Sequence, residues 1–578
     1  MLGVSKFLFG FGFGLMLVAL CIPTHAAVIY VPDDYAEIQW AVDNASIGDI
    51  IIVRDGVYVE NVDVHKQLTI KSENGSANCI IEAANQYDTI FEVAADYVNI
   101  SSFTIKGSTW AGIYIHANYC NVSNNIISDS YRGIFLSHSN NNEVVSNKIS
   151  SNDYGIYLLL SNNNGVLRNT ILNSDYDGIY LYSSDNNDVI DNTVSNNGDG
   201  ISLSSSDNNE IVNNKISSNG YGIYLSHSNN NEILSNTILD NEDGVYLLYS
   251  RSNSIENNIV KSNNYGIYLS CSIYNDITGN TVNSNNLNGV HLSHSNNNDI
   301  VSNTVASNNE NGIYVTQSDN NNISSNKVLD NYFGIYLWYS NNNVIYLNNL
   351  NNVNNVEFYN SLNIWNSTEK ITYTHKGKSY TSYLGNYWSD YIKADLNDDG
   401  ICDTPYVIDE NNIDYYPLVE LVNITANISV ESFSLNATSG VVPLTVEINA
   451  TVVNTGEISG STTVYFYVEG EEIYNETVEV GAGELVYVIH TYTFKNAGTY
   501  NVSVNDLTYI EVVVTPTLLD GVDSNNNGII ELDEVDNLIT KFKADGSVDD
   551  LELLEAIQYW LDGKMEDFAL LKVIQEWL

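Results

Sequence analysis

The middle of the chain alternates apolar and polar positions in short runs that recur at a nearly fixed spacing. In the run "GIYL" at Gly222, Ile223 and Leu225 share one face of a strand, whereas Tyr224 points to the opposite face. The glycine that opens such a run recurs at Gly112, Gly133, Gly155, Gly178, Gly200, Gly222, Gly244, Gly266, Gly289, Gly312 and Gly334. The successive spacings are 21, 22, 23, 22, 22, 22, 22, 23, 23 and 22 residues, which predicts a solenoid with one coil per repeat.

Each repeat carries a second aliphatic pair, such as Ile233 and Ile238, and polar turns separate the runs. Strands this short leave no room for crossover helices, so successive coils must stack directly on one another at about 4.8 Å. The expected fold is mainly β. It is a right-handed parallel β-helix with coils of about 22 residues over 27–420, whose regular repeats cover about 111–355.

Polar residues also recur in register. The ninth residue after each glycine is Asn in all eleven repeats, from Asn121 to Asn343, and Ser holds the sixth position in ten, from Ser139 to Ser340. Asn tolerates left-handed turn geometry, and identical amides stacked in register form hydrogen-bonded ladders. We expect these residues to face inward or to lie in turns. A ligand-binding Asn column is the functional alternative.

Both ends of the solenoid carry capping signals. "DYAEIQWAVDNA" over about 34–45 places Ile38, Ala41, Val42 and Ala45 on one helical face, which predicts a short helix over the first coil. Such a cap blocks edge-to-edge association. At the other end the repeat decays into "GNYWSDYIKADLNDDGICDTPYVI", which predicts a distal closure over about 380–420.

The pattern changes again over 421–515. Longer alternating runs, such as "TVEINATVVN" and "STTVYFYVEG", are separated by turns and predict a seven-stranded antiparallel β-sandwich. The stretch "VVNTGEISGSTTVYFYVEG" resembles the CARDB-type, adhesion-related immunoglobulin-like domains of prokaryotic surface proteins. The resemblance implies either a spacer or an adhesion module.

A loop in the last segment has the ligand spacing of an EF-hand. In "DSNNNGIIELDE", Gly528 makes the central turn and an acidic residue closes the loop at position twelve. The predicted calcium ligands are Asp523, Asn525, Asn527, the Ile529 carbonyl, Glu531 and Glu534. An acidic loop without metal is the alternative.

The surrounding segment, 516–578, predicts a small helical module. "VDDLELLEAIQYWL" and "MEDFALLKVIQEWL" match at an offset of 17 residues, and Lys541 and Lys543 at ligand positions of a second loop exclude metal there. The module resembles a divergent dockerin or the helical ends of archaeal surface proteins. The resemblance implies docking to another surface protein, and a self-contained cap is the alternative.

The distal closure contains a second, incomplete calcium loop. "DLNDDGICD" offers Asp395, Asn397, Asp399, the Ile401 carbonyl and Asp403 as ligands. Tyr406 stands at position twelve, where a complete EF-hand needs an acidic residue. A compact structural calcium loop is therefore expected here.

Composition and the first residues indicate an exported protein. The net charge of −50, from 71 acidic and 21 basic side chains, repels nucleic acid and anionic membranes and attracts cations. Residues 1–26 combine Lys6, an apolar run and a small-x-small cleavage site, which predicts a signal peptide; a membrane anchor is the alternative. Sequons crowd into 423–501, as in a glycosylated cell-surface protein. We expect no integral membrane segment in the mature chain.

An aromatic stripe follows the repeat on the outward face. Nine of the eleven residues that stand two after the glycine are Tyr or Phe: Tyr114, Phe135, Tyr157, Tyr180, Tyr224, Tyr246, Tyr268, Tyr314 and Tyr336. Ser202 and His291 fill the other two positions. Such rings stack on the apolar faces of sugars, which makes the stripe a candidate glycan-binding surface. Stabilisation of the solenoid by stacked rings is the structural alternative.

The residue before the glycine provides the only catalytic candidates. Asp177 and Asp199 lie on consecutive coils, about 5 Å apart, near the separation of a retaining glycosidase pair. A lyase would need a base, and Arg132 lies two coils from Asp177. Asp before Gly also favours turns, which is the structural alternative.

"VPDDYAEIQWAVDNASIGDIIIVRDGVYVENV", the "GIYL…NNN" coils and "GNYWSDY…DGICDTPYVI" together resemble the NosD-like, carbohydrate-binding and sugar-hydrolysis β-helix proteins over roughly 28–420. The resemblance implies the right-handed β-helix, and its members include epimerases, hydrolases, a copper-site maturation factor and non-enzymatic surface proteins. His138, His227 and His294 share one column but lie four and three coils apart, so they cannot hold one ion. We expect calcium, no organic cofactor and no transition metal.

These features predict a secreted, cell-surface protein. Its β-helix has a non-catalytic glycan-binding or structural role, and a calcium-binding docking module attaches it to a surface protein through 516–578. The alternative is a polysaccharide hydrolase, lyase or epimerase that acts on the β-helix face. A polysaccharide is the expected partner in either case, and nucleic acid is not.

Overall fold

The computed structural model describes residues 26–391, 393–420, 428–454, 460–481, 484–515, 530, 532, 534–542, 556–557, 560, 565 and 567–577. It divides into two units: the first takes in 1–370 and 383–421, and the second 371–382 and 422–578. The predicted signal peptide lies outside the described residues, apart from Ala26. No helix in the described part of the chain is long and apolar enough to cross a membrane.

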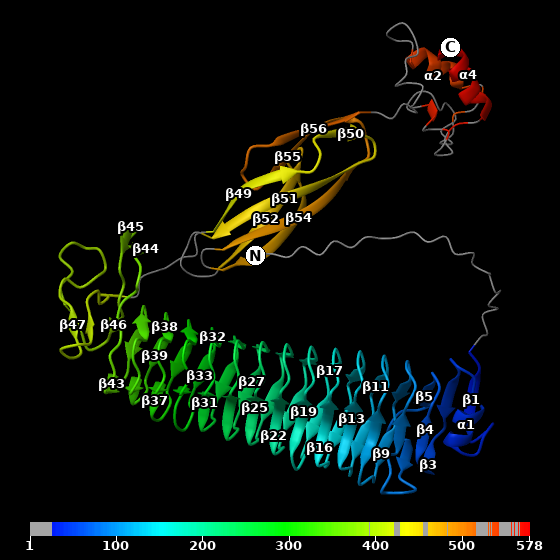
Figure 1. Cartoon of the computed structure of the whole chain (residues 1–578), viewed down its shortest axis with the longest axis horizontal. Coiled ribbons are helices and arrows are strands. Elements are labelled where there is room, and N and C mark those ends of the chain that lie inside the picture. The colour runs from blue at the N-terminus through cyan, green and yellow to red at the C-terminus, as the bar shows by residue number, and fades with distance from the viewer. Residues whose placement is uncertain are drawn as a thin grey trace. The chain divides into compact units, whose positions relative to one another are not determined.

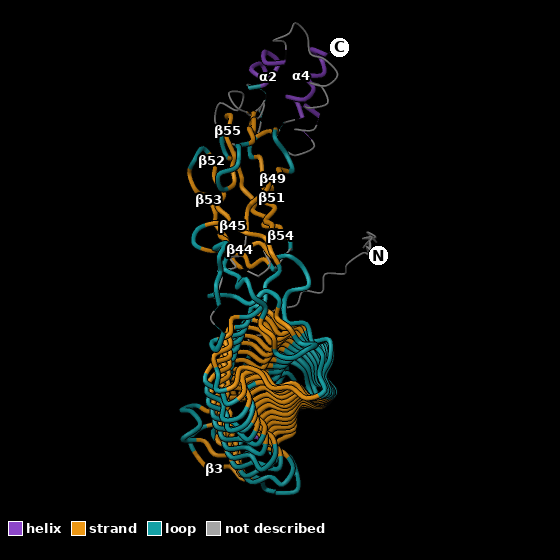
Figure 2. Tube along the Cα trace, turned by 90° about the vertical axis from the view of Figure 1, so that its left-hand side faces the viewer, coloured by secondary structure: helices purple, strands orange, loops and turns teal. Residues whose placement is uncertain are grey.

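The first unit is a right-handed-type parallel β-solenoid of about 15 turns, as the repeat predicts. Each coil gives one strand to each of three parallel sheets, which run side by side along the stack (Figures 1 and 2). The first sheet contains β1 (Val28–Val31), β2 (Ile50–Val53), β5 (Thr69–Ser72), β8 (Asn99–Ser101), β11 (Asn121–Ser123), β14 (Glu143–Val145), β17 (Gly165–Leu167), β20 (Asp188–Ile190), β23 (Glu210–Val212), β26 (Glu232–Leu234), β29 (Ser254–Glu256), β32 (Asp276–Thr278), β35 (Asp299–Val301), β38 (Asn322–Ser324) and β41 (Val344–Tyr346).

The second sheet carries the glycine and the aromatic stripe. It contains β4 (Val62–Val64), β7 (Phe91–Val93), β10 (Ala111–Ile115), β13 (Arg132–Ser137), β16 (Tyr154–Leu159), β19 (Asp177–Tyr182), β22 (Asp199–Ser204), β25 (Tyr221–Ser226), β28 (Asp243–Leu248), β31 (Tyr265–Ser270), β34 (Val290–Ser293), β37 (Asn311–Thr316), β40 (Phe333–Trp338) and β43 (Asn354–Tyr359). Its strands are the longest of each regular coil.

The third sheet closes each coil. It contains β3 (Gly56–Val59), β6 (Cys79–Glu82), β9 (Thr104–Lys106), β12 (Ile126–Ser128), β15 (Lys148–Ser150), β18 (Thr170–Leu172), β21 (Thr193–Ser195), β24 (Lys215–Ser217), β27 (Thr237–Leu239), β30 (Ile259–Lys261), β33 (Thr281–Asn283), β36 (Thr304–Ala306), β39 (Lys327–Leu329), β42 (Asn349–Asn351) and β46 (Tyr387–Trp388). One aliphatic core runs through all three sheets, because equivalent residues such as Ile156, Ile179, Ile201 and Ile223 pair in register and are fully buried.

The polar columns form ladders in the turns, as the Asn pattern predicts. The Oδ1 atom of Asn231 accepts from the Asn209 backbone N–H at 2.8 Å and from the Asn209 amide at 3.0 Å, and Asn231 donates in the same way to Asn253. Asn121 is an exception. The turn before it is one residue shorter, so the Cys120 backbone N–H donates to Asn142 instead, and Asn121 begins β11.

Both ends of the stack are closed. Helix α1 (Ile38–Asn44) buries Ile38, Ala41 and Val42 against the first coils. At the other end β46 joins the third sheet, and its Trp388 packs buried against Trp365 with ring centroids 5.7 Å apart. The short pair β47 (Tyr406–Val407) and β48 (Ile413–Asp414) completes this end.

The second unit contains a hairpin, two sheets and helices. The hairpin is β44 (Ile371–His375) with β45 (Lys378–Ser382). One sheet contains β49 (Ile428–Leu435), β51 (Leu444–Asn454) and β54 (Leu485–Phe494), and the other contains β50 (Ser439–Val441), β56 (Ile510–Thr515), β55 (Gly498–Val504), β52 (Gly460–Val468) and β53 (Glu471–Val480). Both sheets contribute to one buried cluster. The described helices of the tail include α2 (Val535–Phe542) and α4 (Asp567–Trp577).

The two sheets of the second unit differ in detail from the expected seven antiparallel strands. The described residues form eight strands, because the short β50 adds to the edge of the second sheet. β50 pairs with β56 in parallel, so this sheet is mixed. The CARDB resemblance stays a prediction.

Candidate functional site

The aromatic stripe is a column of rings stacked on one another. Neighbouring rings from Tyr114 to Tyr180 and from Tyr224 to Tyr336 have centroids 4.5–5.4 Å apart. Most of these side chains are half-buried, and Phe135 is buried. Because each inner ring has its faces against its neighbours, these faces are covered by protein rather than presented to a ligand.

The column is interrupted once, at Ser202. Tyr180, Ser202 and Tyr224 are register partners on β19, β22 and β25, so the two tyrosines lie two coil spacings apart, about 9.6 Å. Tyr180 and Tyr224 therefore each have one ring face that no ring of the column covers. Ser202 is only 3% exposed, and its Oγ has no partner of normal hydrogen-bond geometry among the described residues.

A second column of positions, beside the interruption, also lacks side chains there. The residue two before the repeat glycine is Tyr131 and Tyr176 in earlier coils, but it is Gly198 and Gly220 here. A Cβ on Gly198 would lie 2.6 Å from the Tyr176 carbonyl oxygen, and one on Gly220 would clash with the Gly198 carbonyl oxygen. The chain approaches itself too closely at these two positions for any side chain.

The missing side chains leave two adjoining clefts. One, of 250 Å³, is lined by Tyr154, Asp177, Tyr180, Asp199, Ser202, Leu203, Ser204, Tyr224 and Ser226. The other, of 360 Å³, is lined by Tyr154, Asp175, Tyr176, Asp177, Gly198, Asp199, Gly220, Tyr221 and Glu242. Four carboxylates and five tyrosines thus surround the interruption, and the lining of both clefts contains no Lys, Arg or His. We call this region the Ser202 cleft.

The sequence-predicted acids lie at the centre of the cleft. Asp177 and Asp199 are register partners on β19 and β22 and line both clefts. Burial raises the pKa of Asp177 to about 7; the nearby Ser202 hydroxyl opposes this rise, and the charge of Asp199 adds to it. Burial also raises the pKa of Asp199, although its Oδ1 accepts from the Tyr221 backbone N–H at 2.9 Å. The site therefore holds a carboxyl that is protonated in a substantial fraction of molecules at neutral pH.

Arg132, the base considered for a lyase, is held away from this pair. Its guanidinium carbon lies 4.5 Å from the Phe135 ring centroid, 4.6 Å from that of Tyr131 and 4.7 Å from that of Trp110. These contacts are cation–π interactions that anchor the start of the aromatic column. Arg132 does not line the Ser202 cleft.

The closure loop places most of its predicted calcium ligands on one turn. Both carboxylate oxygens of Asp395 accept backbone N–H groups, from Asp399 at 3.1 Å and Gly400 at 2.9 Å, and Gly400 has a φ of 92°. Asp403 accepts from the Leu396 N–H at 2.7 Å, and Asn397 donates to Asp399 at 2.9 Å. A curled acidic turn of this kind is how calcium loops present oxygens.

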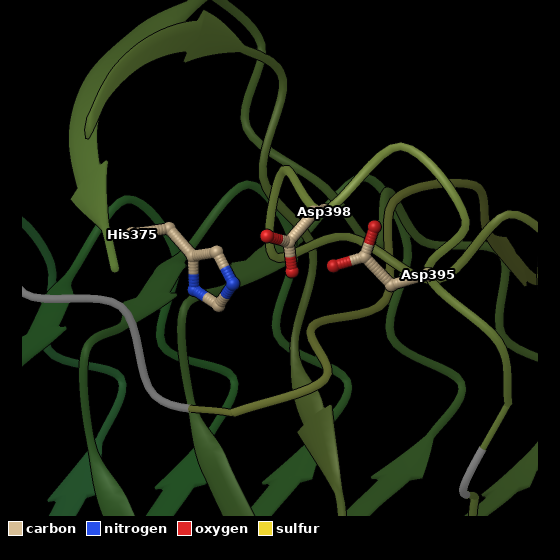
Figure 3. Close-up of side chains that lie close together, drawn as sticks. All are labelled: His375, Asp395 and Asp398. Atoms are coloured by element: carbon tan, nitrogen blue, oxygen red, sulfur yellow. The ribbon is translucent and has the colours of Figure 1, made fainter. Parts of the chain in front are cut away.

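Figure 3 shows Asp395 and Asp398 on this turn, and His375 at the end of β44 in the second unit. Asp398 was not among the predicted ligands. Its φ of 58° places it at the tip of the turn. In the predicted EF-hand, Asp523, Asn525, Asn527, Ile529 and Glu531 lie outside the described residues, and the described Glu534 is buried.

The family model described as periplasmic copper-binding protein (NosD) matches residues 38–243 and 225–392, more than half of the chain. The chain belongs to the NosD family. The match covers the whole Ser202 cleft and ends at residue 392, just before the acidic turn that begins at Asp395.

Other proteins are similar to this chain over a shorter region or at a lower sequence identity. A cell surface glycoprotein of Methanothermus fervidus is 43% identical over 83 residues, which is 14% of this chain and 13% of that protein. The A-module of the Azotobacter vinelandii mannuronan C-5 epimerase AlgE6 is 13% identical with a TM-score of 0.38, over 56% of this chain and 94% of that module. The Dettilon tailspike protein is 12% identical with a TM-score of 0.37, over 84% of this chain and 91% of the tailspike.

Three histidines of this NosD-family chain share one position of the solenoid coil. His138, His227 and His294 each form a turn, with φ of 51–55°, and each ring contacts the preceding serine hydroxyl at 3.0–3.1 Å. Coils four and three apart separate them by about 14 Å or more, too far for one ion. His291 instead replaces a ring of the aromatic column, 4.5 Å from Tyr268, and burial lowers its pKa to about 4.

Sequence reasoning found Asp177, Asp199, Tyr180 and Tyr224 but not the cleft that joins them. The signal was present, because Ser202 is the one small residue in the stripe. The contributions of Gly198 and Gly220 were missed. In a repeat sequence, a glycine indicates only a turn. The close approach of the backbone to itself at Gly198 and Gly220 is visible only in the fold.

Proposed function

We propose that this chain is a secreted cell-surface protein whose β-solenoid binds a glycan, without catalysis, at the Ser202 cleft. The observation that carries the proposal is the interruption of the aromatic column. It leaves Tyr180 and Tyr224 each with one face that no ring of the column covers, on either side of the buried Ser202. Outside the column, Tyr154 lies 6.0 Å from Tyr180 and Tyr221 lies 5.0 Å from Tyr224. Sugars bind proteins through such faces and through hydroxyls placed beside them.

The surface location has two supports. The NosD family is described as periplasmic, and the Methanothermus fervidus relative is a cell surface glycoprotein. The remainder of the stack, with its covered rings and its ladders, then acts as a rigid support for the cleft, in a structural or adhesive role.

The test is a glycan array probed with the full chain. The wild type is expected to bind a defined subset of glycans, and the double variant Y180A/Y224A to lose that binding. Y314A removes a ring from a distant part of the column and serves as the matched control, with binding retained. Wild-type binding to no glycan, or unchanged binding by Y180A/Y224A, would reject the proposal.

A polysaccharide-active enzyme is the second candidate, favoured by Asp177. A carboxyl with a pKa of about 7 beside a second carboxyl is a suitable general acid, and Asp199 on the next coil is placed to act as its partner. Release of new reducing ends or unsaturated products from a polysaccharide panel, lost in D177N, would favour this reading over pure binding.

Calcium is proposed for both acidic loops, and docking to a surface protein for 516–578. The curled Asp395 turn and the acidic ligand spacing of 523–534 support binding of a hard cation by oxygen ligands. Calorimetric titration of the full chain with calcium is expected to show two classes of site. D523N/E534Q is expected to remove one and D395N/D403N the other; heat unchanged by either double variant contradicts the corresponding site.

A further inference from the structure

The Ser202 cleft has dimensions set by the solenoid itself. Tyr180 and Tyr224 are separated by two coil spacings, about 9.6 Å, and aromatic stacking places ring centroids about 4.5–5.5 Å apart. One ring therefore fits between them, in the place where every other coil of the column holds its own aromatic side chain. The adjoining volumes of 250 and 360 Å³ suit one or two sugar units rather than a long polysaccharide segment.

The charge of the cleft is one-sided. Asp175, Asp177, Asp199 and Glu242 line it, and no basic side chain does. No three of these carboxylates converge closely enough to hold a metal ion, because the only such group among the described residues lies elsewhere. The cleft thus attracts a positive charge, but it presents aromatic faces and dispersed acids instead of a metal-binding shell.

Aromatic faces and carboxylates together recognise ammonium groups. A tyrosine face attracts a cation through its ring quadrupole, and a half-buried carboxylate pairs with it in a site that water screens poorly. An anionic sugar would be repelled by the same carboxylates. The Ser202 Oγ is buried at the floor of the cleft beside the Asp177 carboxyl and has no partner of normal hydrogen-bond geometry among the described residues.

We propose that the Ser202 cleft is a binding site for one amino-sugar ring with a free ammonium group, stacked between Tyr180 and Tyr224 with its ammonium group toward Asp177 and Asp199. The proposal rests on the glycan-binding function proposed above and names its ligand class. The ligand completes the aromatic column at the coil where the chain omits a ring.

The test compares three oligosaccharides that share one backbone with an anionic probe. Calorimetric titration of the full chain uses β-1,4-linked oligomers of glucosamine, of N-acetylglucosamine and of glucose; an α-1,4-linked galacturonate oligomer is the anionic probe. The glucosamine oligomer is expected to bind at least 10-fold more tightly than the neutral oligomers, and the anionic oligomer not at all. Equal affinity for glucosamine and N-acetylglucosamine oligomers overturns the ammonium preference. Choline, a small cation without a ring, tests the stacking, and affinity equal to that of the glucosamine oligomer overturns the sugar assignment.

Two pairs of variants locate the ligand. S202Y fills the missing place in the aromatic column and is expected to abolish binding. S293Y adds the same side chain in another outward column, which already holds Tyr182 and Trp338, and is expected to bind as the wild type does. D177N/D199N is expected to remove the preference for the ammonium. D188N/E210Q removes two charges from register-paired acids on the same coils but in the first sheet, and should preserve it.

The outcomes separate this proposal from the function on which it rests. Glycan binding that survives S202Y leaves surface glycan recognition standing and overturns the cleft as its site. If D188N/E210Q loses the preference for the ammonium group as fully as D177N/D199N does, the preference is an effect of overall charge. That result also overturns the assignment of the ammonium group to Asp177 and Asp199. If no oligosaccharide binds and a broad glycan array is also silent, the proposed function itself fails.

Discussion

At the scale of single residues, the cleft depends on what a few positions lack. Ser202 omits a ring, and Gly198 and Gly220 omit side chains altogether. Asp177 and Asp199 line the clefts beside these positions and are half-buried. A binding site in a repeat protein can thus arise by deletion of bulk from an otherwise uniform surface.

The raised pKa of Asp177 predicts a pH-dependent stability effect. The folded protein retains the Asp177 proton up to about pH 7, whereas an unfolded chain releases it near about 3.9. Between these values the folded state binds more protons, so its stability falls as the pH rises through this window and then levels off. D177N removes the carboxyl whose ionisation destabilises the folded state. We expect it to raise the unfolding free energy by about 1–3 kcal/mol at about pH 8 and to have little effect at about pH 4.

Scanning calorimetry of the solenoid transition at both pH values checks this. D191N makes the same change at an exposed aspartate and serves as the control. A D177N variant with the same melting temperature as the wild type at both pH values would show that the Asp177 carboxyl is not destabilised by its surroundings.

The sequence predicted the residues of the site better than its shape. Tyr180, Tyr224, Asp177 and Asp199 follow from their places in the repeat, because the side-chain direction of a strand is fixed by its period. The covering of the ring faces does not follow. Whether stacked rings face a ligand or one another depends on rotamers that register alone does not determine.

At the scale of the coil, Asn ladders hold the turns together. Asn214 accepts from the backbone N–H of Asn192 at 2.9 Å and donates to the Val189 carbonyl at 2.7 Å and to Asn236 at 3.0 Å. All of these groups are buried. Each amide thus satisfies two backbone atoms of the preceding coil, which otherwise would have no partner, and bonds the side-chain amide of the following coil.

N214A is therefore expected to lower the unfolding free energy by about 2–4 kcal/mol, because it leaves several buried hydrogen-bond donors and acceptors without a partner. Denaturant unfolding followed by far-ultraviolet circular dichroism measures the change. N309A, at an exposed turn position, is the matched control and should stay within about 0.5 kcal/mol of the wild type. An N214A variant as stable as N309A would assign the ladders no part in stability.

The repeat pattern predicted one Asn ladder and missed two others. The column of Asn142 and Asn231 was found from its fixed distance to the glycine, but the column through Asn214 is equally continuous, and the column through Asn263 is unbroken from Asn197 to Asn352. Asn is so frequent in every turn of the chain that its periodicity does not single out which columns face inward. Only the burial of the turn decides this.

At the scale of the whole molecule, a solenoid is stable only if its ends are closed. Every inner strand has two neighbours, whereas the first coil has one and would expose its backbone and core to another chain. Helix α1 covers this end with Ile38, Ala41 and Val42, and the pattern of the sequence predicted it correctly because a helix period of 3.6 stands out among strand periods of two.

Opening this cap is expected to convert the protein from a single species into larger assemblies. I38D places a charge at a fully buried position, which detaches α1 and exposes the edge of the first coil. Size-exclusion chromatography with light scattering should then show dimers or larger species at concentrations where the wild type has one mass. W40D makes a similar apolar-to-acidic change on the same helix at a side chain that is 51% exposed, and its mass should equal that of the wild type. If I38D keeps the wild-type mass while its far-ultraviolet spectrum shows loss of helix, the first coil resists association without its cap, and α1 has no role in blocking it.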